Sequence, residues 1–308
     1  MQWKLGHGLV LACAILMVLP GCPNGSTRYG GITVDGNLRT YLMHRPPLAD
    51  DRGPYPVVLV LHGVLDRGKQ MMDYMGFNEI ANREGFIVVY PNGIDNRWRT
   101  LGIGRDGIDD VKFISALLDR LISVQDVDPE RIYVVGASNG AMMAAKLACE
   151  LGDRIAGIAP IMGASLPTSL VADCSPGLPM PVIAIHGDAD PVLPYEGILI
   201  EIGDIPPFGM LPVEDSVAVW RSNNGCGDTA TVIDLPDLDP VDGATVRRTD
   251  WTDCGGAPVT LCTVVGGGHT WPGVVRPTYV GVTSMDIDAS QVVWDFLKGH
   301  RRPGAGQS

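Results

Sequence analysis

A serine stands in the middle of residues 136–140, which read GASNG and match the pattern GxSxG. An apolar run over 131–135 precedes this segment, and a segment of helical period over 139–151 follows it. At a strand-to-helix junction the pattern forms a strained turn that presents the serine hydroxyl, and its small residues let strand and helix approach closely. We therefore predict that Ser138 is a nucleophile. The alternative is a purely structural turn.

A serine hydroxyl becomes a nucleophile when a base accepts its proton and a third group fixes the tautomer of that base. In open α/β sheets with such a turn, the chain order is serine, acid, histidine. Four of the six histidines precede any acid that could follow Ser138: His7, His44, His62 and His186. We expect His300, in a basic tail rich in Pro and Gly, to be solvated. His269 follows an apolar run, within the segment GGGHTW, and is the predicted base.

Two carboxylates are candidates for the third group. Residues 186–191 read HGDADP, so Asp188 and Asp190 both come directly after the apolar run over 181–185. Sites of open α/β sheets gather at the carboxyl ends of strands. One carboxylate is expected to cap the turn before Pro191 while the other orients His269, and these residues alone leave the choice open.

An oxyanion that forms beside the serine needs backbone N–H donors. One donor in this arrangement is the residue after the nucleophile, Asn139, and the second comes from the loop after the first buried strand. That loop reads LHGV over 61–64, which makes Val64 the predicted second donor. We interpret His62 as a residue that stabilises the turn rather than as a catalyst.

Alternating strands and helices are predicted to hold these groups. Unbroken apolar runs, typical of strands covered on both faces, lie at 57–61, 86–90, 131–135, 181–185 and, more weakly, 259–265. Segments of helical period lie at 69–83, at 111–122 after an acidic start at Asp106, Asp109 and Asp110, at 139–151, and at 289–298. This alternation predicts an α/β fold with a mostly parallel, doubly wound sheet and helices on both faces.

Two other segments have their own signals. Residues 32–34 and 39–43 flank Asp35-Gly36, which predicts a hairpin of antiparallel edge strands. Residues 197–211 are rich in Gly and Pro and follow neither period, so we expect a long loop near the site with a role in binding.

The N-terminus has the features of a targeting segment. Lys4 precedes an apolar run over 9–19 that is too short to span a bilayer, and Cys22 follows Pro20-Gly21. We predict a signal peptide over 1–21, a tether over 22–30, a catalytic domain over 31–299 and a flexible tail over 300–308. Lipidation of Cys22 and ordinary signal cleavage remain alternatives, because Pro20 fits a lipobox poorly. Either would make the protein secreted, periplasmic or a cell-surface lipoprotein.

The composition of the chain limits the classes of partner that we expect it to bind. The 308 residues carry 35 Asp and Glu against 23 Lys and Arg, a net charge of -12, which would repel phosphate backbones and anionic headgroups. We expect no nucleic-acid partner, and membrane contact only through a lipid anchor. No cysteine beyond the targeting segment lies in a CxxC or beside a histidine at ligand spacing, so we expect no metal and no cofactor.

Seven short segments carry a family resemblance: LHG at 61–63, YPNG at 90–93, GIDDV at 107–111, VDP at 127–129, GASNGAMM at 136–143, HGDADPVLPY at 186–195 and GGGHTWPG at 266–273. With these, the sequence resembles the bacterial extracellular polyhydroxybutyrate depolymerase-like esterases, which are related to feruloyl and acetylxylan esterases and have the α/β-hydrolase fold. The resemblance covers most of 39–298. It implies that the acid is Asp190, because the family's catalytic Asp stands just before the proline.

The resemblance also implies two disulfides, Cys149 with Cys174 and Cys226 with Cys254. Cys262 stands where relatives tend to carry an aromatic residue, so a free buried thiol is expected.

Trp98 lies in a loop that is shorter than the Cys-containing loop of many relatives, which borders the pocket in the family. We expect Trp98 and Trp271 to wall the substrate pocket, with plain core packing as the alternative for both.

The predicted function is therefore hydrolysis of carboxylic esters through an acyl-enzyme. Relatives that attack solid polymer usually carry an added binding module, and none is recognisable here, so small or oligomeric esters are favoured: hydroxyalkanoate oligomers, or feruloyl and acetyl esters of plant polysaccharides. A peptidase of the same fold is one alternative, although no propeller or extended lid is recognisable. A non-catalytic binding protein that kept the fold is the other, although serine, acid and histidine are all present in order.

Overall fold

The computed structural model describes residues 25–47, 53–101, 107–174, 176–202 and 205–302. The predicted signal peptide, Cys22 and Asp106 lie outside the described residues. None of the helices in the described ranges is both long and apolar enough to span a membrane.

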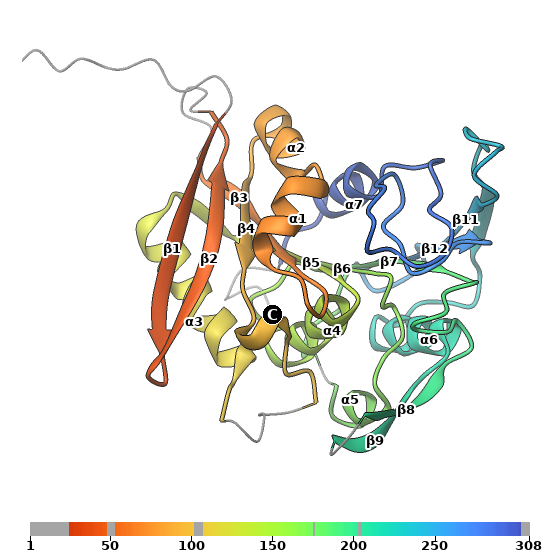
Figure 1. Ribbon diagram of the computed structural model, residues 1–308, viewed down its shortest axis with the longest axis horizontal. Helices are drawn as coiled ribbons and strands as arrows, with labels where there is room; N and C mark the ends of the chain where they lie inside the picture. Colours follow the sequence, from red (N-terminus) through yellow and green to blue (C-terminus); the bar gives the residue numbers. More distant parts are fainter. Residues whose placement is uncertain (1–24, 48–52, 102–106, 175, 203–204, 303–308) are drawn as a thin grey trace, which may run out of the picture.

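The apolar runs form the centre of a ten-stranded sheet with the order β1-β2-β4-β3-β5-β6-β7-β12-β11-β10 (Figure 1). The parallel central strands are β4 (Ile87–Pro91), β3 (Tyr55–Leu61), β5 (Val127–Ala137), β6 (Gly157–Ile161), β7 (Val182–Gly187) and β12 (Val259–Val265). Antiparallel strands complete both ends: β2 (Asn37–Arg45) and β1 (Ser26–Val34), and β11 (Thr245–Trp251) and β10 (Thr231–Asp234).

Helices cover both faces of this sheet. On one face lie α1 (Gly68–Tyr74), α2 (Phe77–Glu84) and α7 (Ala289–Leu297), and on the other lie α3 (Asp110–Val124), α4 (Asn139–Glu150) and α6 (Val213–Asn223) (Figure 1). Successive residues of β3 serve different cores: Val57 and Leu59 pack with α3 and α4, whereas Val58 and Val60 pack with α1, α2 and α7. The strand is apolar at every position because both of its faces are buried. The α/β-hydrolase prediction is confirmed.

Local signals explain several element boundaries. Asp109 caps α3 by accepting a hydrogen bond from the Lys112 amide, as its acidic start predicts. Asp35 and Gly36 both have positive φ, so the hairpin turn joins β1 and β2 as expected. The predicted helix over 69–83 is instead two helices, α1 and α2, because Gly76 adopts a left-handed conformation between them.

Three expectations about the ends and loops need correction. The tether assigned to 22–30 is too long, because β1 begins at Ser26 and pairs with β2 from Ser26↔Arg45 onward. The loop expected over 197–211 contains a two-stranded antiparallel hairpin, β8 (Ile198–Ile202) and β9 (Ile205–Met210), which follows the short helix α5 (Thr168–Asp173) in the chain. In the tail assigned to 300–308, the Arg302 amide donates to the Glu130 carbonyl, so residues 300–302 run along the folded body.

Candidate active site

Ser138 occupies a strained turn between β5 and α4. Its φ of 53° and ψ of -118° lie outside the regions that residues with a Cβ prefer. The surrounding backbone holds this conformation, because the Ser138 amide donates to the Ile161 carbonyl at 3.0 Å and its carbonyl accepts from the Met142 amide at 3.1 Å. The side chain is partly exposed at the carboxyl end of β5.

Two glycines let α4 start directly against the sheet. A Cβ on Gly136 would lie 2.1 Å from the Gly140 carbonyl oxygen, and a Cβ on Gly140 would lie 2.4 Å from the Leu61 carbonyl oxygen. Both would meet backbone rather than a movable side chain. The glycines of GASNG are thus required by the close approach of β3, β5 and α4, which is the context that the motif needs.

One carboxylate both closes its own turn and holds His269. Asp190 accepts from Nδ1 of His269 through Oδ2 at 2.7 Å, and through Oδ1 from the amides of Val192 and Leu193 at 2.8 and 2.9 Å. Asp188 is exposed and accepts instead from the Gly266 amide at 2.6 Å. The expected division of the two tasks between the two carboxylates is therefore wrong, and Asp190 performs both.

The surroundings of Asp190 favour its charged form. Burial by itself disfavours the carboxylate, but hydrogen bonds from His186, from His269 and from the Leu193 amide outweigh that cost and hold the pKa of Asp190 well below its ordinary value. A charged acceptor at Oδ2 fixes the proton of His269 on Nδ1. It leaves Nε2 as the nitrogen that can accept a proton.

His186, which chain order excludes as the base, contacts the acid instead. Its Nδ1 accepts from the Ala164 amide at 3.1 Å, so Nε2 carries the proton. That N–H faces the Leu193 carbonyl at 2.9 Å and Oδ2 of Asp190 at 3.4 Å. His186 thus joins the loop after β6 to the loop that carries the acid. Its position at the end of a buried strand was the available signal.

All three predicted catalytic side chains lie at the same edge of the sheet. Ser138 follows β5, Asp190 follows β7 and His269 follows β12, and these strands are joined through β6 in one parallel set. The loop after β6 touches the serine turn, since a Cβ on Gly163 would lie 3.1 Å from the Ser138 Cα. Ser138 and His269 are both partly exposed at this edge.

The loop after β3 also lies against Ser138. A Cβ on Gly63 would be 3.5 Å from the Ser138 Cβ, and the next residue, Val64, is 54% exposed. Asn139 is the first residue of α4, where an amide has no acceptor within its own helix. Both predicted oxyanion donors therefore border the serine.

His62 has the turn-stabilising contacts expected of it. Its Nδ1 donates to the Gly63 carbonyl at 2.7 Å, and its Nε2 accepts from the Gly93 amide at 2.9 Å. Burial lowers the pKa of His62, in keeping with this neutral tautomer. Because the carbonyl and N–H of one peptide point in opposite directions, the bond to Gly63 turns the Val64 N–H away from His62.

Neither tryptophan is an open pocket wall. Trp271 is fully buried, meets Phe77 edge to face, and its indole N–H donates to Ser290 at 3.2 Å, so it is a core residue. Trp98 is 3% exposed and its indole N–H donates to the His62 carbonyl at 2.9 Å, beneath the loop that carries Val64.

The Asn139 side chain has a role that the sequence did not indicate. Its Oδ1 accepts from the Trp98 amide at 2.7 Å and its Nδ2 donates to the Trp98 carbonyl at 3.2 Å. These two bonds tie the loop after β4 to the serine turn.

Two disulfides join Cys149 to Cys174 and Cys226 to Cys254, the pairs that the resemblance implies. Cys262 is a free, buried thiol on β12. Such disulfides persist in oxidising compartments and fit an extracytoplasmic location.

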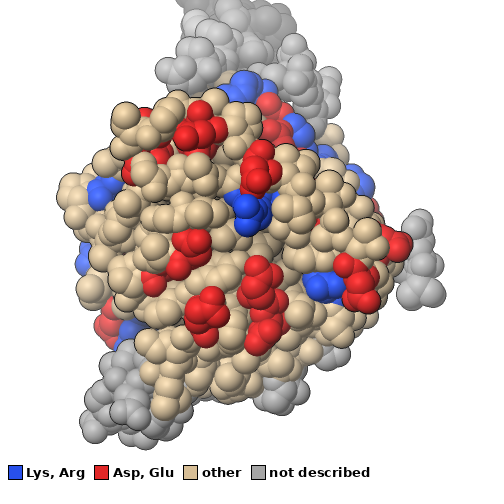
Figure 2. Space-filling view, turned by 90° about the vertical axis from the view of Figure 1, so that its right-hand side faces the viewer, with Lys and Arg blue, Asp and Glu red and all other residues tan. Residues whose placement is uncertain are grey.

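The surface charge follows the composition. Figure 2 shows more acidic than basic side chains on the face that bears β10 and β11. Near these strands, burial together with the negative charges of Asp286, Asp242 and Asp239 raises the pKa of Asp237. Such a surface disfavours anionic partners. Among the described residues, no group of three or more His, Cys, Asp or Glu is arranged to hold a metal ion.

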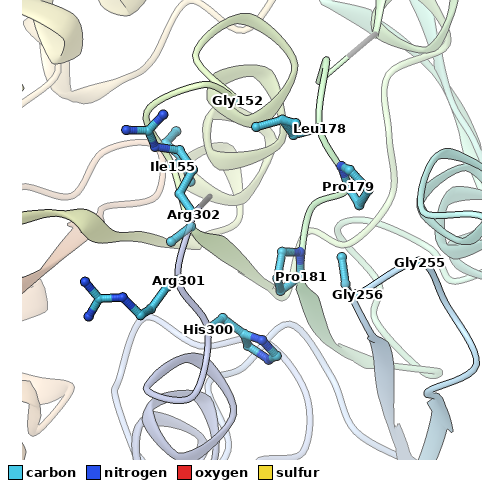
Figure 3. A pocket seen from close by; sticks show the side chains of 12 residues that line it. Gly152, Ile155, Leu178, Pro179, Pro181, Gly255, Gly256, His300, Arg301 and Arg302 are labelled. Carbon is cyan, nitrogen blue, oxygen red and sulfur yellow. The ribbon is translucent and has the colours of Figure 1, made fainter. Parts of the chain in front are cut away.

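A pocket of about 150 Å³ lies at the opposite edge of the sheet, where β6, β7 and β12 begin (Figure 3). His300 is one of the residues that line it. The ring packs against Phe296 and burial lowers its pKa, so His300 is half-buried rather than fully solvated. This edge is remote from Ser138, which agrees with setting His300 aside as a base.

Comparisons with known proteins place this chain among esterases. Residues 39–167 match the family model described as "Esterase PHB depolymerase". A protein of Nocardia uniformis subsp. tsuyamanensis named "Putative esterase NocK" is 33% identical over 285 residues, or 87% of this chain and 81% of that protein. Feruloyl esterase B of Piromyces equi is 27% identical over 227 residues, which are 70% of this chain and 39% of that longer protein.

A solved structure supports the fold. The acetyl xylan esterase from Aspergillus awamori matches with a TM-score of 0.57 and 14% sequence identity, over 88% of this chain and 99% of that one. At this identity the match shows a shared architecture.

Proposed function

Because this chain belongs to the Esterase PHB depolymerase family and is a carboxylic ester hydrolase, we propose that it cleaves esters through an acyl-enzyme on Ser138, with His269 as base and Asp190 as the group that orients the base. The observation that carries the proposal is the 2.7 Å hydrogen bond from Nδ1 of His269 to the buried carboxylate of Asp190. It leaves Nε2 free to take a proton at the sheet edge where Ser138 stands.

In the first step, Oγ of Ser138 attacks the ester carbonyl while Nε2 of His269 takes the hydroxyl proton. The amides of Val64 and Asn139 donate to the oxyanion, and each such donor is worth about 3 kcal/mol of transition-state stabilisation in comparable enzymes. The imidazolium then gives its proton to the departing alcohol. Water, deprotonated by His269, then attacks the acyl-enzyme. The acid leaves as the imidazolium returns the proton to Oγ, which restores Ser138.

We propose small or oligomeric esters as substrates, either hydroxyalkanoate oligomers or feruloyl and acetyl esters of plant polysaccharides. Apolar side chains beside the site support an ester with an apolar acyl or alcohol group. Val64 is 54% exposed beside the serine turn, Val192 is 46% exposed within the turn that carries the acid, and Val280 is 47% exposed and pairs with His269 in a β-bridge. Turnover of hydroxybutyrate oligomers, methyl ferulate and acetylated xylan separates these substrates.

Export is part of the proposal. The two disulfides support a location outside the cytoplasm, with residues 1–21 as a signal peptide and Cys22 either lipidated or not. Mass spectrometry of the mature N-terminus distinguishes an acylated Cys22 from an ordinary cleavage site.

Turnover of p-nitrophenyl butyrate tests the mechanism. Ser138→Ala is expected to lower kcat by several orders of magnitude and to abolish labelling by a fluorophosphonate probe. The control is Ser123→Ala, which removes an exposed hydroxyl from α3 and should leave both readouts unchanged. Parent-like turnover by Ser138→Ala rules out the acyl-enzyme. Folded parent protein that neither hydrolyses esters nor takes up the probe favours a binding protein, and cleavage of peptides in place of esters favours a peptidase.

A further inference from the structure

We propose that the ion pair between Asp66 and Arg276 is a positioning device that holds the oxyanion-binding amide of Val64 and the base His269 in a fixed relation to each other. The inference rests on the proposed function. In it, the two residues position other groups and take no part in the chemical steps themselves. Neither residue belongs to the predicted site, and they are 210 positions apart in the chain.

The pair has two hydrogen bonds and is largely enclosed. Nη1 and Nη2 of Arg276 donate to the two carboxylate oxygens of Asp66 at 2.8 and 3.0 Å. The Arg276 side chain is 5% exposed and that of Asp66 is 21% exposed, in contrast to the open ion pairs elsewhere on the surface. The guanidinium also lies over the rings of Tyr74 and Tyr279, with centroids 4.7 and 5.5 Å away. A two-pronged, shielded pair of this kind fixes direction as well as distance.

On one side, the pair controls the loop that carries Val64. The Asp66 amide donates to the Gly63 carbonyl at 3.2 Å, the same carbonyl that accepts from His62. That carbonyl and the Val64 N–H belong to one peptide plane, so the bonds to the carbonyl set the direction of the N–H. A shift of Asp66 would rotate this peptide. The Val64 N–H would then turn away from the place where the oxyanion forms.

On the other side, Arg276 belongs to the segment that carries the base loop. The Tyr279 amide donates to the Arg276 carbonyl at 3.1 Å, and the His269 amide donates to the Val280 carbonyl at 2.7 Å. The Gly268 amide donates to the Val282 carbonyl at 2.8 Å. Hydrogen bonds therefore link the Val64 peptide to His269 by way of Asp66 and Arg276.

This linkage matters because the two groups act on the same tetrahedral intermediate from different loops. Displacement of a catalytic group by about 1 Å can cost roughly 100-fold in rate. The loop after β3 and the segment after β12 leave the sheet at distant strands, and β5, β6 and β7 separate them in the strand order. The ion pair joins the two loops directly and therefore limits their movement relative to each other.

Variants at both ends of the pair test the proposal. Asp66→Asn keeps the size and the backbone amide of residue 66 but removes the charge. Arg276→Lys keeps the charge but loses the two-pronged geometry. The control is Asp234→Asn, which breaks the exposed pair of Asp234 with Arg247 on the outermost strand β10. Each protein is assayed for kcat and KM with p-nitrophenyl butyrate, for inhibition by a trifluoromethyl ketone, and for its unfolding temperature.

The ketone is informative because addition of the serine oxygen to its carbonyl gives a hemiketal whose oxyanion needs the same donors as the reaction. Asp66→Asn and Arg276→Lys are expected to lower kcat by about 10- to 100-fold with KM close to the parent value. Inhibition by the ketone should become weaker by a similar factor. Asp234→Asn should change neither.

A purely structural pair would lower the unfolding temperature and leave kcat and ketone affinity at parent values while the protein is folded. That result, in either variant, overturns the proposal. If Asp66→Asn does not fold, the milder Arg276→Lys decides the matter, because it keeps the buried charge balanced. Failure of the proposed function looks different, since the parent itself would then neither turn over the ester nor bind the ketone.

Discussion

Oδ2 of Asp190 accepts a hydrogen bond from Nδ1 of His269, while Oδ1 of the same carboxylate is already held by the two amides of its own turn. The orientation of the base is therefore set by the backbone of the 190–193 turn. An Asn at 190 has the same shape as Asp. Its oxygen would stay bonded to those amides, and its NH2 group would face His269.

Asp190→Asn follows directly from this arrangement. The amide oxygen would stay on the Val192 and Leu193 amides, so the NH2 group would face Nδ1 of His269 and would force that nitrogen to accept. The proton would then sit on Nε2, which could no longer take one from Ser138. We expect kcat for p-nitrophenyl butyrate to fall by about 10⁴-fold with KM little changed, as in other triads with the wrong tautomer.

The matched control is Asp188→Asn in the same turn. Asp188 is exposed and bonds the Gly266 amide through its side chain, a contact that an amide oxygen can replace. Its kcat is expected to stay within about tenfold of the parent, since removing an exposed charge has small effects. A larger loss in Asp188→Asn than in Asp190→Asn would show that the acid has been misassigned.

The depressed pKa of Asp190 also predicts how stability depends on pH. Its folded pKa lies below the value of about 3.9 that Asp has in an unfolded chain, so the charged form stabilises the fold. That contribution is complete above the unfolded pKa and is lost as the pH falls through the folded pKa. Urea unfolding of the parent and of Asp190→Asn at pH 7, 5 and 3 measures it.

The parent should exceed Asp190→Asn in the free energy of unfolding by less at pH 3 than at pH 5. The comparison isolates residue 190, because the other carboxylates titrate in both proteins. A difference that stays the same down to pH 3, or grows, would contradict the assigned direction of the pKa shift.

The centre of the fold was predictable from the sequence because it rests on local patterns. Every residue of β3 is apolar, and GASNG stands between a strand and a helix, so the strand, the turn and Ser138 follow from the order of residue types. The outer strand β10 was missed because all four of its residues are exposed, so it lacks an apolar pattern. The strand β6 was missed because it is short and contains Pro160.

The supporting residues of the site were less accessible to sequence reasoning. The bond of His186 to the Ala164 amide and the pair of Asp66 with Arg276 join segments that only the folded sheet brings together. The residues that make these contacts are of common types, and their positions in the chain follow neither the helical nor the strand period. Trp271 shows the converse case, because it was expected to wall the substrate pocket, whereas its burial against Phe77 makes it part of the core.

Gly140→Ala tests the close approach that holds the serine turn. The new Cβ would lie 2.4 Å from the Leu61 carbonyl oxygen and 2.6 Å from that of His62, and both belong to backbone that cannot swing away. We expect a loss of about 1–3 kcal/mol in the free energy of unfolding, typical of overpacking, and a fall in kcat because Ser138 shifts with the helix.

The control for this change is Gly299→Ala, just beyond α7. A Cβ there meets nothing within 4 Å, and the backbone is not left-handed. Urea unfolding and ester turnover should both stay at parent values. If Gly140→Ala unfolds like the parent and keeps its kcat, the helix and β3 do not need a glycine at this point.

Cys262 should be chemically silent while the protein is folded. It is fully buried on β12, and burial raises the pKa of its thiol to about 12, so only about one thiol in ten thousand is ionised at pH 8. Because the thiolate is the form that reacts, iodoacetamide should leave Cys262 unmodified in the native protein and should alkylate it fully in urea.

Peptide mass spectrometry reads the modification at this residue alone, and the disulfide-bonded Cys149 serves as an internal control that stays unmodified in both conditions unless a reductant is added. Rapid alkylation of Cys262 in folded, active enzyme would show that β12 opens to solvent, which would also loosen the strand from which the His269 loop departs.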